Sequence, residues 1–435
     1  MEGIMKLILI ADAIPQQNGA GITQTLYNLF SGYPKRITVV CEEGEDISNN
    51  KHELPCDILK YRAYRIKPLA NRLGSYLNPR IDRLNYKWLV NAPVSPEILS
   101  LRGQSIVVVS TNVLHKLIFA WKLITAGFTV IPYFMDDWLD GNMTHWKNGS
   151  VQQVAADLLR KAPARLMISI NLQKILEQRY QLPNVPTLVV HNPSPPPLRI
   201  HTQSHTKFPP SGGIGGQTHT SFPLSGGTKG GTHTPHPPVN LSTNQPVNLI
   251  TYAGSIWPMH ADALIAVAKA IQLLNASGKK DFSLCIYTSQ VHWEKYKSML
   301  QGEGVHWGGW LPYDEVRKKF SDAFLLLCTA SFEKAQQAFT NSSVQTKLTD
   351  YIAAGRPVLV VTPTGAASGE WVQNENCGYW MQTKEPEEIA TILQNLAGQP
   401  VDWEQKAQKA IDLASTKYST PAVQQGLYQF LAAHG

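Results

Sequence analysis

Residues 341–361, NSSVQTKLTDYIAAGRPVLVV, constrain the fold more than any other stretch of the chain. Apolar residues recur at helical spacing from Val344 to Ile352, which predicts a helix of about three turns with one buried face. Gly355 supplies a C-terminal stop, and Pro357 prevents the helix from continuing. The run Val-Leu-Val-Val that follows is apolar throughout, which is typical of a strand covered on both faces. The stretch therefore predicts a helix and a buried strand of a parallel α/β sheet.

The same helix carries a polar face with residue types that suit a phosphorylated nucleoside. Ser343, Lys347 and Asp350 are spaced at i, i+4 and i+7, so they share one side. A helix N-terminus near Ser342 and Ser343, with a lysine beside it, suits a phosphate. A carboxylate one turn further on suits the hydroxyls of a ribose. The alternative is that Lys347 and Asp350 are an ordinary surface pair at i,i+3.

The run SSVQTKLTDYIAAGRPVL resembles the donor-binding helix of GT-B glycosyltransferases, in particular the large retaining family 4. In that family the pattern contains Pro-Thr-Lys, then Glu-Tyr, and then Gly-x-Pro-Val. Here Asp350 stands for the ribose-binding Glu, Gln345 for the Pro, and Ser342 for a second Glu of many members. The resemblance implies a retaining hexosyltransferase that uses a nucleotide sugar, with no metal or other cofactor. It also implies two Rossmann-like domains that face each other across a cleft.

Composition sets broad limits on the class of protein. At 435 residues the chain is long enough for two domains, and 43% hydrophobic with 16% charged residues is typical of a soluble globular protein. No apolar run approaches the length of a transmembrane helix, and the opening MEGIMKLILIADAIP favours a first strand over a signal peptide. The five cysteines are dispersed, mostly in apolar runs, which predicts reduced thiols in a cytoplasmic protein.

Residues 1–193 are predicted to form a first Rossmann-like domain, since short apolar runs alternate with helical patterns. A strand over residues 5–10 leads into a turn with Gly19 and Gly21, and a helix begins near Thr23. A strand, a glycine loop and a helix N-terminus together form a cradle for an anion. The family resemblance places this domain on the acceptor side, with the loop facing the diphosphate of the donor.

Asp136 and Asp137 follow the strand predicted over residues 128–134. The carboxyl ends of parallel strands line the ligand crevice of open α/β sheets, so these two are the predicted catalytic carboxylates. Many family members have a histidine here, and the run Asp-Asp-Trp resembles a variant of some relatives. Two alternatives stay open: the carboxylates cap the next segment, or they hold a metal together with Asp140.

Residues 194–247 are rich in Pro, Gly, Ser, Thr and His and contain a tandem repeat, with Phe208 in one copy and Phe222 in the next. Such a composition buries too little apolar surface to offset the entropy of ordering, so we expect a disordered linker between the domains. The histidines of this segment are metal-ligand types, but nothing fixes their geometry. A slipped repeat is the simpler explanation.

Residues 248–415 are predicted to form a second, donor-binding domain of the same kind. The first strand ends at Gly254 and Ser255, which resembles the family's loop where the backbone approaches the phosphates of the donor. The family usually has a basic residue a few positions later, and His260 is the candidate in this chain. The last helix, within about residues 416–435, is predicted to cross back to the first domain.

The net charge of +7 is concentrated between Lys60 and Trp88, where eight Lys and Arg residues oppose a single acidic residue, Asp82. Five aromatic residues are interleaved with them. This combination suits an anionic membrane surface, such as the inner face of the plasma membrane, or a phosphorylated acceptor. An ordinary solvated surface is the alternative. No nucleic-acid-binding motif accompanies the charge, so no nucleic acid is predicted as a partner.

These features together predict a glycosyltransferase of polysaccharide biosynthesis. It would move a sugar from a nucleotide-sugar donor to a saccharide or lipid-linked acceptor. One alternative is an inactive, nucleotide-binding scaffold subunit, because Ser342 replaces a Glu and no lysine follows Gly254. A nucleotide-sugar epimerase of the same architecture is a third hypothesis, although its extra acidic and histidine residues are not identified in this chain.

Overall fold

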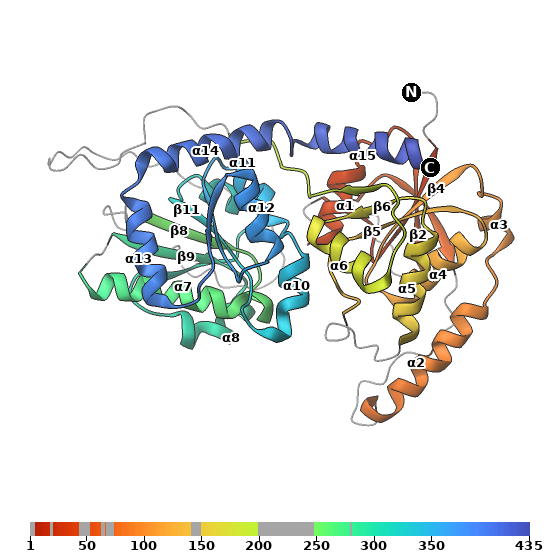
Figure 1. The fold of residues 1–435 in the computed structure, drawn as a ribbon, viewed down its shortest axis with the longest axis horizontal. Helices are drawn as coiled ribbons and strands as arrows, with labels where there is room; N and C mark the ends of the chain where they lie inside the picture. Colours follow the sequence, from red (N-terminus) through yellow and green to blue (C-terminus); the bar gives the residue numbers. More distant parts are fainter. Residues whose placement is uncertain are drawn as a thin grey trace, which may run out of the picture.

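The computed structural model describes residues 5–17, 21–42, 53–61, 66, 74–140, 149–198, 248–278 and 281–435. For residues 74–79, 82, 149 and 150 it describes the backbone alone. Two lobes lie side by side, and each contains a parallel sheet covered by helices (Figure 1). The predicted α/β architecture with two Rossmann-like sheets is confirmed.

The first sheet has seven parallel strands in the order β3-β2-β1-β4-β5-β6-β7. Helices cover both of its faces, and β4 is buried along its whole length for that reason. The strand order reverses between β1 and β4, and a ligand crevice is expected at the carboxyl ends of these strands. The strands are β1 (Lys6–Ala11), β2 (Ile37–Glu42), β3 (Cys56–Tyr61), β4 (Ser105–Ser110), β5 (Thr129–Phe134), β6 (Arg165–Met167) and β7 (Thr187–Val189). The helices of this lobe are α1 (Ile22–Phe30), α2 (Gly74–Asn91), α3 (Pro96–Leu99), α4 (Leu114–Thr125), α5 (Gly149–Lys161) and α6 (Ile170–Tyr180).

The second sheet has six parallel strands in the order β10-β9-β8-β11-β12-β13. Its reversal point lies between β8 and β11, so these two strand ends border the equivalent crevice. The strands are β8 (Asn248–Ala253), β9 (Phe282–Tyr287), β10 (Val305–Gly309), β11 (Leu325–Thr329), β12 (Val358–Val361) and β13 (Gly378–Met381). The helices are α7 (Pro258–Ala276), α8 (Gln290–Leu300), α9 (Tyr313–Phe320), the 3-10 turn η1 (Lys334–Gln336), α10 (Gln337–Ser342), α11 (Lys347–Ala353), α12 (Ala367–Glu375), α13 (Pro386–Ala397), α14 (Pro400–Ser415) and α15 (Thr420–His434).

The stretch 341–361 contains a break that the sequence did not predict. Helix α10 ends at Ser342, Ser343 is extended, and α11 begins only at Lys347. The backbone between the helices pairs with Ser368 of α12 instead, through the carbonyl of Ser343 and the N–H of Gln345. The predicted helix start at Ser342 and Ser343 is therefore wrong, whereas β12 begins and ends where predicted.

Two segments connect the lobes, and they pair with each other. The N–H of Ser194 donates to the carbonyl of Tyr418 at 2.6 Å, and its hydroxyl donates to the carbonyl of Thr349 at 2.9 Å. Residues 194–198 are thus ordered, contrary to the disorder predicted for them. Residues 199–247 lie outside the described residues, and the predicted domain boundaries stay predictions.

Helix α15 lies on the first lobe although it follows the second in the chain (Figure 1). The Tyr428 hydroxyl donates to the carbonyl of Leu29 in α1 at 2.8 Å, and its ring meets that of Tyr33 edge-on. The amide of Gln424 donates to the carbonyl of Asn28 at 2.8 Å. The last helix therefore joins the C-terminus to the first lobe by specific contacts.

Candidate functional site

Lys347 lies at the carboxyl edge of the second sheet, where β8 ends. Its ammonium is 4.2 Å from the centre of the Tyr252 ring, and a Cβ placed on Gly254 would lie 3.3 Å from it. Gly254 also has a φ of +130°, a conformation that other residues rarely adopt. A side chain at this position would strain the backbone and crowd Lys347, so the glycine lets the ammonium approach the exposed backbone at Gly254 and Ser255. A phosphate oxygen at this backbone would meet a positive charge, which is the arrangement that a leaving diphosphate needs.

Asp350 lies one turn further along α11 and is held by a residue of another helix. The hydroxyl of Tyr313, at the start of α9, donates to its Oδ1 at 2.6 Å. Burial raises the pKa of Asp350 to about 6, while the Tyr313 hydrogen bond acts in the opposite direction. At neutral pH the carboxylate is therefore mostly ionised, and Oδ2 remains as an acceptor for a ligand hydroxyl.

The two lobes meet through the predicted carboxylates and serines. The hydroxyl of Ser343 donates to Oδ1 of Asp136 at 2.7 Å, and the backbone N–H of Asp137 donates to the hydroxyl of Ser342 at 3.3 Å. Asp136 follows β5, so this contact joins the carboxyl edge of the first sheet to the second lobe. Burial, with a smaller contribution from the charge of Asp137, raises the pKa of Asp136 to about 6. Ser342 and Ser343 are buried in this contact.

Comparison with known proteins identifies the second lobe. Residues 247–399 match the family described as "Glycosyl transferases group 1". The second lobe is therefore a group 1 glycosyltransferase domain. No curated protein sequence matches it.

Solved structures show the fold of the whole chain. HepE from Anabaena, in complex with UDP-glucose, is 12% identical with a TM-score of 0.60, and the alignment covers 99% of this chain and 100% of that one. Sucrose-phosphate synthase from Thermosynechococcus elongatus is 11% identical with a TM-score of 0.62, over 99% and 100% of the two chains. WaaG, a glycosyltransferase involved in lipopolysaccharide biosynthesis, is 12% identical with a TM-score of 0.55, over 98% and 99%. At these identities the likeness shows the GT-B fold, as predicted from the sequence.

His260 does not supply the positive charge expected of it in this glycosyltransferase. Its Nδ1 lies 2.9 Å from the carbonyl of Thr329, and the ring packs edge-on against Phe339. Burial, with a smaller contribution from the charge of Lys347, lowers the pKa of His260 to about 3. The imidazole is therefore neutral at neutral pH. Of Lys347 and His260, only Lys347 can supply the positive charge beside Gly254. Burial lowers the pKa of Lys347.

Asp137 is held in an ion pair within the first lobe of the enzyme. Both of its carboxylate oxygens accept hydrogen bonds from Arg179 of α6, each at 2.7 Å. Arg179 also lies 3.7 Å from Asp140. The guanidinium of Arg179 therefore lies where the alternative hypothesis expects a metal ion. Because both of its carboxylate oxygens are engaged, Asp137 is not available as a base. Asp136 is the carboxylate of the pair that faces the second lobe.

The structure describes only one of the two glycines predicted to bind the donor from the first lobe. Gly21 precedes α1 with a φ of +51°, and the space where a Cβ would lie is open, so the backbone there is accessible. Gly19 lies outside the described residues. Whether either residue binds the donor stays a prediction.

Sequence reasoning missed residues whose partners are far away in the chain. Thr111 donates to the carboxylate of Asp12, and the buried Lys116 donates to the carbonyls of Ala11 and Asp12 at 2.9 and 3.0 Å. These residues lie at the carboxyl ends of β1 and β4, on the crevice of the first sheet. An aspartate directly after the first strand was the available signal.

Proposed function

We propose that this enzyme transfers a sugar from a uridine nucleotide sugar to a saccharide or lipid-linked acceptor, with retention of the anomeric configuration. The observation that carries the proposal is the contact of Lys347 with the exposed glycine turn at Gly254. UDP-glucose bound to HepE supports a uridine donor, and the role of WaaG in lipopolysaccharide biosynthesis supports a lipid-linked acceptor.

On the donor side, the proposal assigns charge stabilisation to Lys347 and ribose binding to Asp350. The diphosphate gains negative charge as it leaves, and a fixed ammonium in a partly buried site stabilises that charge strongly. The hydrogen bond from Tyr313 fixes one carboxylate oxygen of Asp350. The other oxygen can then accept from a ribose hydroxyl without further loss of side-chain entropy at Asp350.

On the acceptor side, we assign Asp136 to accept the proton of the acceptor hydroxyl. The hydroxyl oxygen bonds to the anomeric carbon on the same face from which the nucleoside diphosphate leaves, so the configuration is retained. A carboxylate with a pKa of about 6 is close to the pH at which it operates, which is the condition for efficient general-base catalysis. Its position between the lobes supports this role, because an acceptor on the first lobe would approach a donor bound on the second lobe past this carboxylate. The proposed reaction requires no metal.

The test is the thermal unfolding midpoint with UDP, GDP and ADP, followed by assays of UDP release from UDP-sugars. A nucleotide at about a hundred times its Kd adds roughly 2.7 kcal/mol to stability, which is a clear shift. UDP is expected to stabilise the wild type and Lys384→Met, a control at an exposed lysine, but not Lys347→Met or Asp350→Ala. If no nucleotide stabilises the wild type, the inactive scaffold becomes the better hypothesis.

We also propose that the enzyme works at the cytoplasmic face of a membrane and binds it through α2. No helix that the structure describes has the length and apolar character to cross a bilayer. Leu84 and Trp88, 46% and 45% exposed, lie one turn apart on α2 beside exposed Arg80, Arg83 and Lys87. Apolar and basic side chains on one exposed helix suit an anionic lipid surface.

A neighbouring apolar side chain extends this surface. Asn85 of α2 binds the backbone of Ile66, accepting from its N–H at 2.7 Å and donating to its carbonyl at 2.8 Å. Ile66 is 41% exposed in that position. Wild type is expected to sediment with anionic vesicles and Trp88→Ser to lose most of that binding. Equal binding to neutral vesicles would contradict the assignment.

A further inference from the structure

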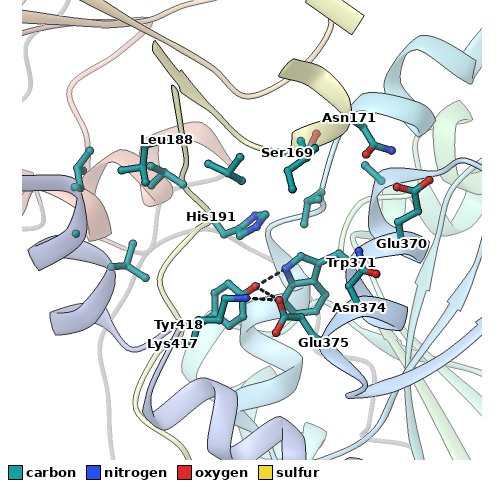
Figure 2. Close-up of a pocket in the computed structure, with 18 of the residues that line it drawn as sticks. Ser169, Asn171, Leu188, His191, Glu370, Trp371, Asn374, Glu375, Lys417 and Tyr418 are labelled. Carbon is teal, nitrogen blue, oxygen red and sulfur yellow. Dashed lines mark hydrogen bonds and ion pairs between the residues drawn. The ribbon is translucent and has the colours of Figure 1, made fainter. Parts of the chain in front are cut away.

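A cavity of about 420 Å³ lies between the lobes, and Lys347, Asp350 and Gly254 do not line it (Figure 2). One side comes from the first lobe, at the start of α6 and the end of β7. The other side comes from α12 of the second lobe, and α15 closes the space together with Lys417 and Tyr418. A volume of this size is in the range of small-molecule sites.

His191 lies in the middle of this cavity, between Ser169 and Tyr418 (Figure 2). Its ring centre is 5.6 Å from that of Tyr418 and 6.1 Å from that of Trp371. Nδ1 is buried, and within the part of the chain that the structure describes neither ring nitrogen has a hydrogen-bond partner. Burial lowers the pKa of His191 to about 4, so the ring is neutral at neutral pH. A buried ring nitrogen almost always has a hydrogen-bond partner, and Nδ1 of His191 has none from the described chain.

The charged groups near His191 are already compensated. Lys417 and Glu375 form an ion pair at 2.5 Å, and the same carboxylate oxygen accepts from the Tyr418 hydroxyl at 2.8 Å (Figure 2). The Trp371 indole in turn donates to the Tyr418 hydroxyl at 2.9 Å. The rest of the wall around His191 is apolar, with Leu188, Val190, Val344, Val423 and Leu427. Lys174 and Glu370, which carry opposite charges, also line the cavity, together with Asn171 and Asn374. An uncharged ligand matches this interior better than an ion, because it leaves no charge without a partner.

Gly426 leaves additional room at the edge of the cavity. It lies within α15, and nothing is within 4 Å of the position a Cβ would take. Glycine is less favourable than alanine inside a helix, and here no neighbouring atom requires it. The missing side chain keeps the cavity open beside α15.

We propose that this cavity binds a small uncharged molecule that has a ring and one hydroxyl group. The hydroxyl pairs with His191, and the ring packs between the aromatic side chains of Trp371 and Tyr418 and the apolar wall. Since the wall comes from both lobes, an occupant favours the arrangement of the lobes described above. The inference does not depend on the proposed sugar transfer.

The test uses p-cresol and toluene as probes, measured by calorimetric titration of the full chain. The two probes differ only in the hydroxyl. Wild type is expected to bind p-cresol about three- to tenfold more tightly than toluene, as one uncharged hydrogen bond allows. His191→Phe keeps the ring shape and is expected to remove this preference.

Gly426→Leu fills the cavity and is expected to weaken p-cresol binding at least tenfold. Gln425→Leu is the matched control, because it adds the same side chain to the neighbouring exposed position outside the cavity. Ala422→Leu, at a second lining position on α15, gives the same result if Gly426→Leu folds poorly. Failure of p-cresol to bind wild type up to its solubility, or equal binding to Gly426→Leu and Gln425→Leu, overturns the proposal.

Discussion

The donor edge of the second sheet and the acceptor edge of the first are built in different ways. At the donor edge, Lys347 and Asp350 lie on one short helix, and a glycine turn lies beside them. At the acceptor edge, each polar side chain is held by a residue from a distant segment: Asp136 by Ser343, and Asp137 by Arg179. A site carried by one short segment leaves a local motif in the sequence, whereas a site assembled by tertiary contacts does not.

The largest expected effect comes from the acceptor edge. Asp137 is 1% exposed and Arg179 is 30% exposed, so Arg179→Met leaves a buried carboxylate without its partner. The free energy of unfolding is expected to fall by about 3–5 kcal/mol, measured by denaturant titration. The double variant Asp137→Asn with Arg179→Met should recover much of the loss. If the single variant is as stable as wild type, the ion pair does not organise this edge.

The second prediction separates stability from catalysis at Asp136. Its pKa is raised above the ordinary value, so the folded state holds the proton more tightly than the unfolded state. Ionisation therefore costs stability above about pH 6, and the cost disappears as the pH falls from about 6 to 4. Asp136→Asn is expected to raise the free energy of unfolding by about 1–2 kcal/mol at pH 8, with no difference at pH 4.

The same variant is expected to lose most sugar transfer while it keeps its affinity for UDP. Unfolding at the two pH values and UDP titration give these quantities independently. A variant that is less stable than wild type at pH 8 would show that the Ser343 contact outweighs the burial of the carboxylate.

The smallest expected effect lies at the donor edge. Tyr313→Phe removes one hydrogen bond to Asp350 without changing the shape of the side chain. The affinity for UDP is expected to fall about three- to tenfold, because one oriented acceptor is lost. Tyr313 also lowers the pKa of Asp350, so the pH below which UDP binding weakens should move upward in the variant. A matched change at Tyr296→Phe, on α8, is expected to leave UDP affinity unchanged.

Sequence patterns predicted the two α/β sheets but not their edge strands β3 and β13, nor the contacts between segments. The apolar run of β12, the glycine turn at Gly254 and the last helix could be predicted because each depends on local periodicity or backbone conformation. The break before Lys347 could not, because it depends on Ser368, which is 25 residues from Ser343 along the chain. The neutral state of His260 likewise comes from burial by elements that only the fold brings together.

The pairing of Ser194 with Tyr418 has a consequence for how the gene can vary. The two segments that connect the lobes are hydrogen-bonded to each other. The N–H of Leu198 also donates to the carbonyl of Ala353, at the end of α11. The lobes are therefore already joined when the repeat segment starts. For the disordered linker predicted from composition, gain or loss of a repeat copy is expected to change mainly the entropy of closing a loop, about 0.6 kcal/mol for each doubling of length. A change in repeat number is therefore expected to leave the contacts between the two lobes as they are.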